Sequence, residues 1–218
     1  RGSGYGCRFL ERCTMSTVGI VIPTFGEEFW QVKSKMLAAE ARYDGYGADE
    51  ILCVHGDSLA SARNQGAREI GTDYIVFLDA DDRLCYNYCG ILRDNLEEGN
   101  VLYQPQTQGM IDYQLSDEPP NFIPDRDMNV SNNLVIGTAI TAKYGVEFDP
   151  VLPALEDWDF FLRMISLGAK VKQVPGMVYY VGQDRDDSRN APSGAHDQAY
   201  QIIRRKGIQV SDYLWEYK

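Results

Sequence analysis

Three aspartates follow an apolar run in this chain. Asp79, Asp81 and Asp82 come directly after residues 74–78, which read Tyr-Ile-Val-Phe-Leu and indicate a buried strand. Residues two apart on a strand face the same side, so Asp79 and Asp81 are expected to converge where the strand ends. Like charges so close repel and lose water on burial, and a divalent cation with oxygen ligands would offset both costs. The spacing therefore predicts an Mg²⁺ or Mn²⁺ site, with a solvated Asp-rich turn as the alternative.

A second pair of acids, Glu156 and Asp157, opens a segment whose apolar residues recur at helical spacing. Acids at a helix N-terminus are good partners for the helix dipole, which is one sufficient explanation for them. A carboxylate there also stays ionised and can accept a proton from an attacking hydroxyl, as a general base does. Arg63 precedes the acidic strand and is either a surface residue or a group that faces the ligand edge, where it could hold a phosphate or orient Asp79. His196 is a candidate metal ligand or a solvated side chain.

The elements that would position these groups alternate between strand and helix. Strands are predicted over 18–23, 50–55 and 74–78, and helices over 29–42 and from a Ser58 cap to about 69. This order predicts an α/β fold with a mostly parallel sheet and right-handed crossovers. Ligands bind beyond the carboxyl ends of such strands, where three separate loops fall together. In the first helix, Phe29, Val32 and Met36 share one face, as in an amphipathic helix.

The second half of the chain is less regular. Its predicted elements are short strands over 100–106, 109–115 and 134–142, a helix from 154 to 167, a late strand over 170–181 and a terminal helix over 196–206. Residues 116–133 are polar and proline-bearing, and loops of that length are usually functional or disordered. The charged segment 182–194 carries Arg185 and Arg189, which a lid closing on a diphosphate would need.

Composition and charge narrow the functional classes. The 218 residues suit one domain with a sizeable core. The net charge of -11 disfavours broad contact with nucleic-acid phosphates or anionic lipid. The chain has five cysteines, no Cys-x-x-Cys pair and only two histidines, which argues against a structural zinc site. The odd number of cysteines without a disulfide pattern favours a reducing, cytosolic compartment. No stretch approaches the ~20 apolar residues of a membrane span, and residues 1–14 are expected to be an expression remnant or disordered leader.

Four segments taken together resemble the GT-A glycosyltransferases of family 2. In order they are residues 21–28 (Val-Ile-Pro-Thr-Phe-Gly-Glu-Glu), 62–66 (Ala-Arg-Asn-Gln-Gly), 77–82 (Phe-Leu-Asp-Ala-Asp-Asp) and 156–163 (Glu-Asp-Trp-Asp-Phe-Phe-Leu-Arg). Each motif alone is weak to moderate, but their order extends the resemblance from about Val18 to Val181. It implies a GT-A-like, Rossmann-type, mostly parallel central sheet flanked by helices, in a compact form like those of phage and bacterial modification loci.

The resemblance also implies a metal-dependent, inverting transfer of a sugar from a nucleoside-diphosphate sugar, with a UDP-sugar as the expected donor. Asp79-Ala80-Asp81 would be the D-x-D motif, in which Asp81 binds the metal and Asp79 lies near ribose and metal. Glu156 and Asp157 would be the acceptor-side acidic pair, with Asp157 as base. The residues assigned to the nucleotide pocket are Pro23, Thr24, Phe25, Glu27, Asp57, Arg63 and Asp79. Residues 15–218 would form one domain, with 15–90 binding the nucleotide sugar and 91–218 the acceptor.

The chain departs from the usual family pattern at several positions. Gly26 stands where Asn is usual, and residues 55–58 read His-Gly-Asp-Ser where Asp-Asp-Gly-Ser is usual, so Asp57 would act in a shifted register or the base is read differently. The usual His motif after the late strand is not evident, so the third metal ligand is open, and His196 is one candidate for it. The acceptor is open, and the acidic surface favours a protein, glycan or small molecule over nucleic acid.

Two other functions are also compatible with aspartates at the end of a buried strand. One is a non-catalytic nucleotide-sugar-binding module, since fold does not fix function. The other is a metal-dependent phosphohydrolase, which also places Asp-x-Asp after a buried strand. That class needs a Gly-Thr-like pair directly afterwards, where this chain has Asp82 and Arg83.

Overall fold

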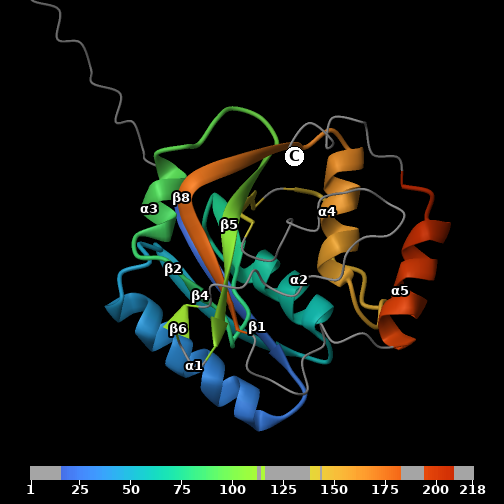
Figure 1. Ribbon diagram of the computed structural model, residues 1–218, viewed down its shortest axis with the longest axis horizontal. Helices are drawn as coiled ribbons and strands as arrows, with labels where there is room; N and C mark the ends of the chain where they lie inside the picture. Colours follow the sequence, from blue (N-terminus) through green and yellow to red (C-terminus); the bar gives the residue numbers. More distant parts are fainter. Residues whose placement is uncertain (1–15, 112–113, 116–137, 143, 183–193, 209–218) are drawn as a thin grey trace, which may run out of the picture.

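The structure is a computed structural model that describes residues 16–111, 114–115, 138–142, 144–182 and 194–208 (Figure 1). The predicted leader 1–14, the predicted long loop 116–133 and the arginines of segment 183–193 lie outside the described residues. Among the described residues, no helix is both long and apolar enough to cross a bilayer.

The first sheet contains the predicted parallel core. Its strands are β1 (Val18–Phe25), β2 (Glu50–Gly56), β3 (Tyr74–Phe77) and β7 (Ile140–Thr141), in the order β2-β1-β3-β7. β1 pairs in parallel with both β2 and β3, and β7 is antiparallel to β3. Because the pairing aligns Phe25 with Gly56 and Val21 with Phe77, the carboxyl ends of β1, β2 and β3 meet at one edge. The predicted convergence of three loops is confirmed.

Two helices make the crossovers, α1 (Glu28–Tyr43) and α2 (Leu59–Glu69). Ser58 caps α2 as predicted: its hydroxyl accepts a hydrogen bond from the Ser61 amide at 3.1 Å, and its own amide donates to the Ser61 hydroxyl at 2.9 Å. α2 lies close on β1, because a Cβ added to Gly66 would stand 2.3 Å from Val21 Cγ1. The sequence therefore has glycine at a point where the helix backbone approaches the sheet closely.

The second sheet has the order β4-β8-β5-β6. Its strands are β4 (Arg83–Leu84), β5 (Val101–Ile111), β6 (Gln114–Leu115) and β8 (Lys170–Gly182). The two strands predicted over 100–106 and 109–115 are instead one long strand and a short hairpin partner. β8 pairs in parallel along β5, and its register shifts between Gln104 and Gln106. Pro105, which cannot donate a ladder hydrogen bond, sits in that irregularity rather than ending the strand.

The remaining helices are α3 (Tyr88–Arg93), α4 (Glu156–Ser166) and α5 (Gly194–Arg205). Apolar side chains fill both faces of the first sheet: Ile20 and Ile22 belong to one buried cluster, and Val21 to another. The alternation along β1 shows a strand buried on both sides, as in an α/β sandwich. Figure 1 shows α2 on one side of this sheet and α1 on the other.

Phe29, Val32 and Met36 share one face of α1 as predicted, and that face is exposed. Phe29, Val32 and Met36 are 60%, 51% and 67% exposed. The buried residues of α1 are Ser34, Leu37, Ala38 and Ala41. These mostly small side chains let the helix backbone lie close to the sheet, so the face with the larger apolar residues points away from it.

Candidate active site

The acidic run leaves the end of β3 at the edge where the ligand loops meet. The Leu78 amide donates to the Val21 carbonyl at 2.9 Å, which keeps the chain beside β1 for one more residue. The Asp82 amide then donates to the Asp79 carbonyl at 3.1 Å and closes a turn. Asp79 and Asp81 are both partly exposed, whereas Asp82 is buried. The first two carboxylates are thus available to a ligand at this edge.

Arg63 joins the two acidic motifs. Its side chain is 1% exposed and donates to Asp79 Oδ1 at 2.9 Å and to Glu156 Oε1 at 2.8 Å. Burial alone would lower its pKa, but the negative charges of Asp79, Glu156 and Asp157 raise it well above the ordinary value. The surface alternative for Arg63 is therefore excluded: it is a buried, permanently charged bridge between β3 and α4.

Asn64, beside Arg63, fixes the segment that supports the bridge. Its side-chain amide donates to the Phe148 carbonyl at 2.8 Å, and its oxygen accepts from the Phe148 amide at 2.7 Å. The Phe148 ring lies 5.4 Å from the Arg63 guanidinium, meets Phe77 edge-on and stacks on Phe160 at 4.0 Å. Strand β3, the loop at Phe148 and helix α4 are thereby locked in one arrangement.

The second acidic pair opens α4 as predicted. Leu155, the residue before the pair, has a φ of 59°, in the left-handed region. This backbone conformation is uncommon for leucine, and residues that adopt it are often found at functional sites. Burial and the neighbouring Glu156 charge raise the pKa of Asp157 to about 6, while Arg63 acts in the opposite direction. Asp157 is partly exposed to solvent, whereas Glu156 is buried against Arg63. Asp157 is therefore the accessible member of the pair, and its raised pKa suits the general base that the sequence predicts there.

Asp82 has a structural partner that no local sequence signal indicates. The Tyr179 hydroxyl donates to Asp82 Oδ2 at 2.5 Å, and the Gly182 amide donates to Oδ1 at 2.8 Å. The same tyrosine oxygen accepts from the Asp79 amide at 3.4 Å. Burial and the charges of Asp81 and Asp79 raise the pKa of Asp82 well above its usual range. The third acid of the run therefore ties the loop to β8.

Gly182 also makes this junction possible. A Cβ added there would stand 2.7 Å from the Asp81 carbonyl oxygen, closer than real contacts allow. The end of β8 can approach the acidic loop only with glycine at this position. Tyr179 and Gly182 were both missed by sequence reasoning, because they lie about a hundred residues from the motif they support.

The predicted nucleotide-pocket residues fall at the same edge but differ in exposure. Pro23 and Thr24 are buried in β1, and the Thr24 hydroxyl lies 3.1 Å from His55 Nδ1. Phe25 is partly exposed, and Glu27 and Asp57 are exposed. Phe25, Glu27 and Asp57 are therefore the accessible members of this set at the edge.

Gly26, the departure from the family pattern, has φ +75°, and a Cβ added there would meet no atom within 4 Å. Glycine and asparagine are the residues that most readily adopt this left-handed conformation. The substitution of the usual Asn by Gly therefore preserves the turn between β1 and α1. It does not disturb the edge where the pocket residues lie.

The carboxylates of Asp79 and Asp81 suit a hard cation that takes its other ligands from phosphates and water. Among the described residues, no three His, Cys, Asp or Glu side chains are grouped to hold a metal ion. His196 is buried in the first turn of α5 and forms no such group with Asp79 and Asp81 in the part of the chain that the structure describes. The two-carboxylate site remains a prediction, and so does the role of His196.

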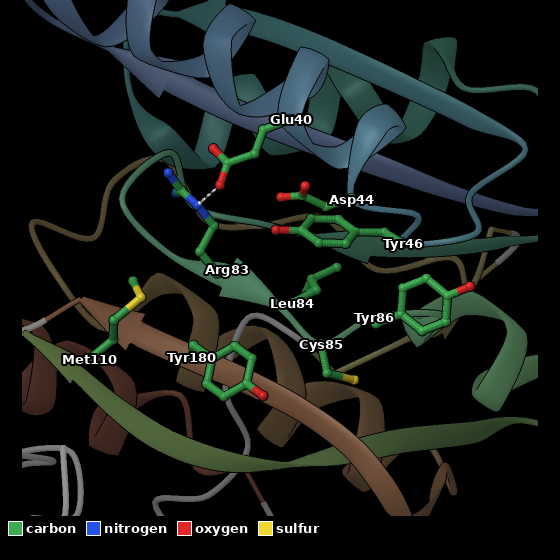
Figure 2. Close-up of a pocket in the computed structure, with 9 residues that line it drawn as sticks. All are labelled: Glu40, Asp44, Tyr46, Arg83, Leu84, Cys85, Tyr86, Met110 and Tyr180. Carbon is green, nitrogen blue, oxygen red and sulfur yellow. Dashed lines mark hydrogen bonds and ion pairs between the residues drawn. The ribbon is translucent and has the colours of Figure 1, made fainter. Parts of the chain in front are cut away.

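A pocket of about 350 Å³ lies beside β4 and the end of α1 (Figure 2). Its lining residues are Glu40, Asp44, Tyr46, Arg83, Leu84, Cys85, Tyr86, Met110 and Tyr180. Two of these residues, Arg83 and Glu40, form an ion pair with an N–O distance of 2.6 Å, drawn as a dashed line in Figure 2. None of the acidic-motif residues lines this pocket, so it is separate from the edge described above.

Part of the chain matches a known protein family. Residues 37–136 match the model of the family described as Glycosyl transferase family 2, which confirms the predicted resemblance over that stretch. No curated protein sequence matches the chain.

Solved structures show the same fold. The S. aureus TarS 1-349 crystal structure in complex with UDP-GlcNAc matches with a TM-score of 0.58 and 10% identity, over 91% of this chain and 70% of that one. The TarS 1-349 complex with UDP matches with a TM-score of 0.55 and 9% identity, over 91% and 69%. A longer TarS crystal structure matches with a TM-score of 0.54 and 9% identity, and there this chain spans 40% of the relative's length. The predicted fold class is confirmed.

Proposed function

We propose that this chain, identified with the family 2 glycosyltransferases by its sequence match and fold, moves a sugar from a nucleoside-diphosphate sugar to an acceptor hydroxyl. In this proposal the transfer depends on Mn²⁺ or Mg²⁺ and inverts the anomeric carbon. Asp81 and Asp79 hold the metal and donor side, and Asp157 is the base. A UDP-sugar is the proposed donor, because a TarS structure of the same fold was solved with UDP-GlcNAc.

The observation that carries the proposal is the Arg63 bridge. One buried guanidinium contacts Asp79, from the D-x-D motif, and Glu156, from the acidic pair that contains the base. A transferase needs its leaving-group site and its base on different segments held at a fixed separation, because they act on opposite faces of the sugar. Positioning of that kind contributes much of an enzyme's rate enhancement. A site that only bound the donor would have no use for a base held beside it.

The proposed reaction is a single displacement. The acceptor oxygen forms a bond to the anomeric carbon, its proton passes to Asp157, and the bond from that carbon to the diphosphate oxygen breaks. The nucleoside diphosphate leaves with the electron pair of the broken bond. A bound divalent cation would offset the charge that gathers on this leaving group. Phe25, Glu27 and Asp57 are the residues proposed to contact the nucleoside.

Donor binding can be tested without knowing the acceptor. Thermal unfolding is measured with UDP, GDP, CDP and dTDP, with and without Mn²⁺, for the native chain, Asp81→Ala and the control Asp94→Ala. Asp94 is an exposed carboxylate at the end of α3. A ligand that binds only the folded state raises its stability once its concentration passes Kd. We expect UDP to stabilise the native chain and Asp94→Ala in the presence of Mn²⁺, and to leave the stability of Asp81→Ala unchanged. If none of the diphosphates stabilises the native chain, the proposed donor site is wrong.

Turnover separates the enzyme from a binding module on the same fold. A transferase releases UDP from its UDP-sugar, slowly to water or faster to an acceptor, and Asp157→Asn should reduce release to a slow residual rate while keeping the UDP-dependent stabilisation. A chain that binds UDP and the UDP-sugar but never releases product, with any of a panel of glycan, protein and small-molecule acceptors, would be a binding module. The phosphohydrolase alternative is disfavoured, because Asp79 is bound to Arg63 and two β-α units precede the motif.

The cellular setting stays a prediction. Cys53, Cys85 and Cys89 are free thiols among the described residues. The reducing, cytosolic compartment is proposed on the cysteine pattern of the sequence alone. Acceptors of the protein, glycan or small-molecule classes remain the proposed ones, on the ground of the net charge of -11.

A further inference from the structure

Helix α1 carries a stripe of apolar residues that are exposed in the part of the chain that the structure describes. The stripe consists of Phe29, Val32, Met36, Ala39 and Tyr43. Phe29, Val32, Met36 and Tyr43 are 60%, 51%, 67% and 92% exposed, and Ala39 is exposed as well. Of the seven large hydrophobic side chains exposed among the described residues, four belong to this one helix. An apolar grouping of that kind usually marks an interaction site.

The spacing of the stripe indicates what kind of surface would cover it. Its members are separated by three, four, three and four residues, which is the a/d repeat of a seam between two packed helices. The buried residues of α1, among them Leu37, Ala38 and Ala41, lie on the opposite side of the helix and already contact the sheet. α1 therefore has two packing faces, one used by its own fold and one built for another helix.

We propose that the stripe packs against the same stripe of a second copy of the chain, with the two α1 helices antiparallel around a two-fold axis near Met36. In that arrangement Phe29 of each copy approaches Tyr43 of the other. A two-fold contact uses one surface twice, so a single self-complementary helix is sufficient to form it.

Charges along α1 favour the antiparallel direction. Glu28 lies in the first turn and Arg42 in the last, both exposed. An antiparallel pair brings each Glu28 near Arg42 of the other copy and opposes the two helix dipoles, whereas a parallel pair aligns like dipole ends. Exposed ion pairs contribute at most about 1 kcal/mol, so they select the direction and the apolar stripe supplies the attraction.

The extent of the stripe predicts a weak dimer. Its ends, Phe29 and Tyr43, are separated by roughly 21 Å along the helix, and a single pair of such helices buries less than the ~1,600 Å² of a standard interface. Each copy also carries a net charge of -11, so the copies repel at long range. Added salt screens this repulsion and leaves apolar contact intact, so association should strengthen as salt rises.

The helix is already fixed in place for such a contact. Glu40, beside the stripe, pairs with Arg83 of β4 at 2.6 Å, which anchors the C-terminal half of α1 to the second sheet (Figure 2). The Arg83 guanidinium also donates to the Asp82 carbonyl at 2.8 Å. Docking on the outer face therefore requires no repacking of the inner one.

The self-association is tested by sedimentation velocity over a range of chain concentrations and salt. Met36→Glu places a charge at the centre of the seam and should raise the dimer dissociation constant at least about tenfold. The matched control is Leu167→Glu, which changes an equally exposed apolar residue (69%) outside α1 and should dimerise as the native chain does. Circular dichroism of both variants verifies that they remain folded.

Cross-linking identifies the surface directly. Met36→Cys should form a covalent dimer with a short thiol cross-linker at a rate well above the native chain, whose own cysteines set the background, and Leu167→Cys should not. A native chain that stays monomeric up to about 1 mM, or a Met36→Glu variant that dimerises as well as the native chain, would overturn the proposal. So would dimers that weaken on addition of salt.

Discussion

Arg63 is the residue on which both acidic motifs depend, and its removal should be costly. Arg63→Gln leaves the Asp79 and Glu156 carboxylates without their shared cation, and breaking a buried ion pair from one side typically costs about 3–5 kcal/mol of unfolding free energy. Arg68→Gln on the same helix is the control. Its side chain is 61% exposed and pairs with Glu147, itself 70% exposed, so the change should cost less than about 1 kcal/mol.

Urea denaturation of the two variants provides the comparison. Equal losses would show that the Arg63 bridge contributes no more than a surface pair and would remove the main support for a preorganised site. A loss confined to Arg63→Gln, with the slope against urea unchanged, would place the effect in the folded state.

Asp157 should give the transfer reaction a pH dependence with a definite sign. Its pKa is raised to about 6 by burial and the Glu156 charge. Only the ionised carboxylate can accept the acceptor proton, so the rate of UDP release should be constant above about pH 7 and fall about tenfold per pH unit below pH 6. The measurement is a pH profile of UDP release at saturating donor. Asp157→Asn should leave only a slow, pH-independent rate, and a native profile that rises toward acid pH would contradict the assignment.

The sequence predicts the acidic residues of the site better than the residues that they contact. The two acidic clusters are recognisable because the members of each are close in sequence: Asp79 with Asp81, and Glu156 with Asp157. The ion pair of Arg63 with Glu156 and the hydrogen bonds of Asn64 with Phe148 join distant parts of the chain and have no local pattern. Asp82 shows the limit most clearly. Its residue type is the same as that of its neighbours, yet burial under Tyr179 gives it a different role.

At the scale of elements, the end of β8 should control metal and donor binding through the acidic loop. Tyr179→Phe removes the hydroxyl that binds Asp82 and the Asp79 amide. A buried acceptor left without its donor costs about 1–3 kcal/mol, and a loosened loop should raise the Kd for UDP with Mn²⁺ about tenfold. The matched control is Tyr180→Phe, the next residue on β8, which lines the separate pocket instead.

Titration calorimetry of UDP in the presence of Mn²⁺ measures this effect. A second control separates positioning from stability: Leu162→Ala in α4 should destabilise the fold at least as much and leave the Kd for UDP unchanged. If Tyr179→Phe binds UDP like the native chain, β8 only stabilises the fold.

The elements were predictable where each formed from its own residues. The strands and helices of 18–78 have strong periodic and capping signals, and α4 and α5 begin and end within two residues of the prediction. α3 and β4 were missed, because six and two residues are too short to show a period. The sequence does not show which face of α1 packs inward, for a physical reason: periodicity shows which residues share a face, and only the packed sheet decides whether the larger or the smaller side chains turn inward.

At the scale of the whole molecule, two buried clusters share the same strands. On β3, Ile75 and Phe77 belong to one cluster and Val76 to the other; on β5, Leu102 and Tyr103 divide in the same way. A strand that loses its packing on one face therefore loses support on the other. The predicted donor and acceptor halves, 15–90 and 91–218, are joined in both clusters, and β7 of the second half pairs with β3 of the first.

This sharing predicts that the chain unfolds in one cooperative transition, which also tests its assignment as a single domain. Leu37 of α1 and Leu162 of α4 are each 1% exposed, one in each cluster and one in each half. Leu37→Ala and Leu162→Ala should each lower the unfolding free energy by about 2–5 kcal/mol. In urea, tryptophan fluorescence and far-ultraviolet circular dichroism should report the same midpoint for each variant. If either variant splits the transition, so that one signal is lost while the other persists, the two halves fold independently, and the Arg63 bridge joins separate domains across an interface.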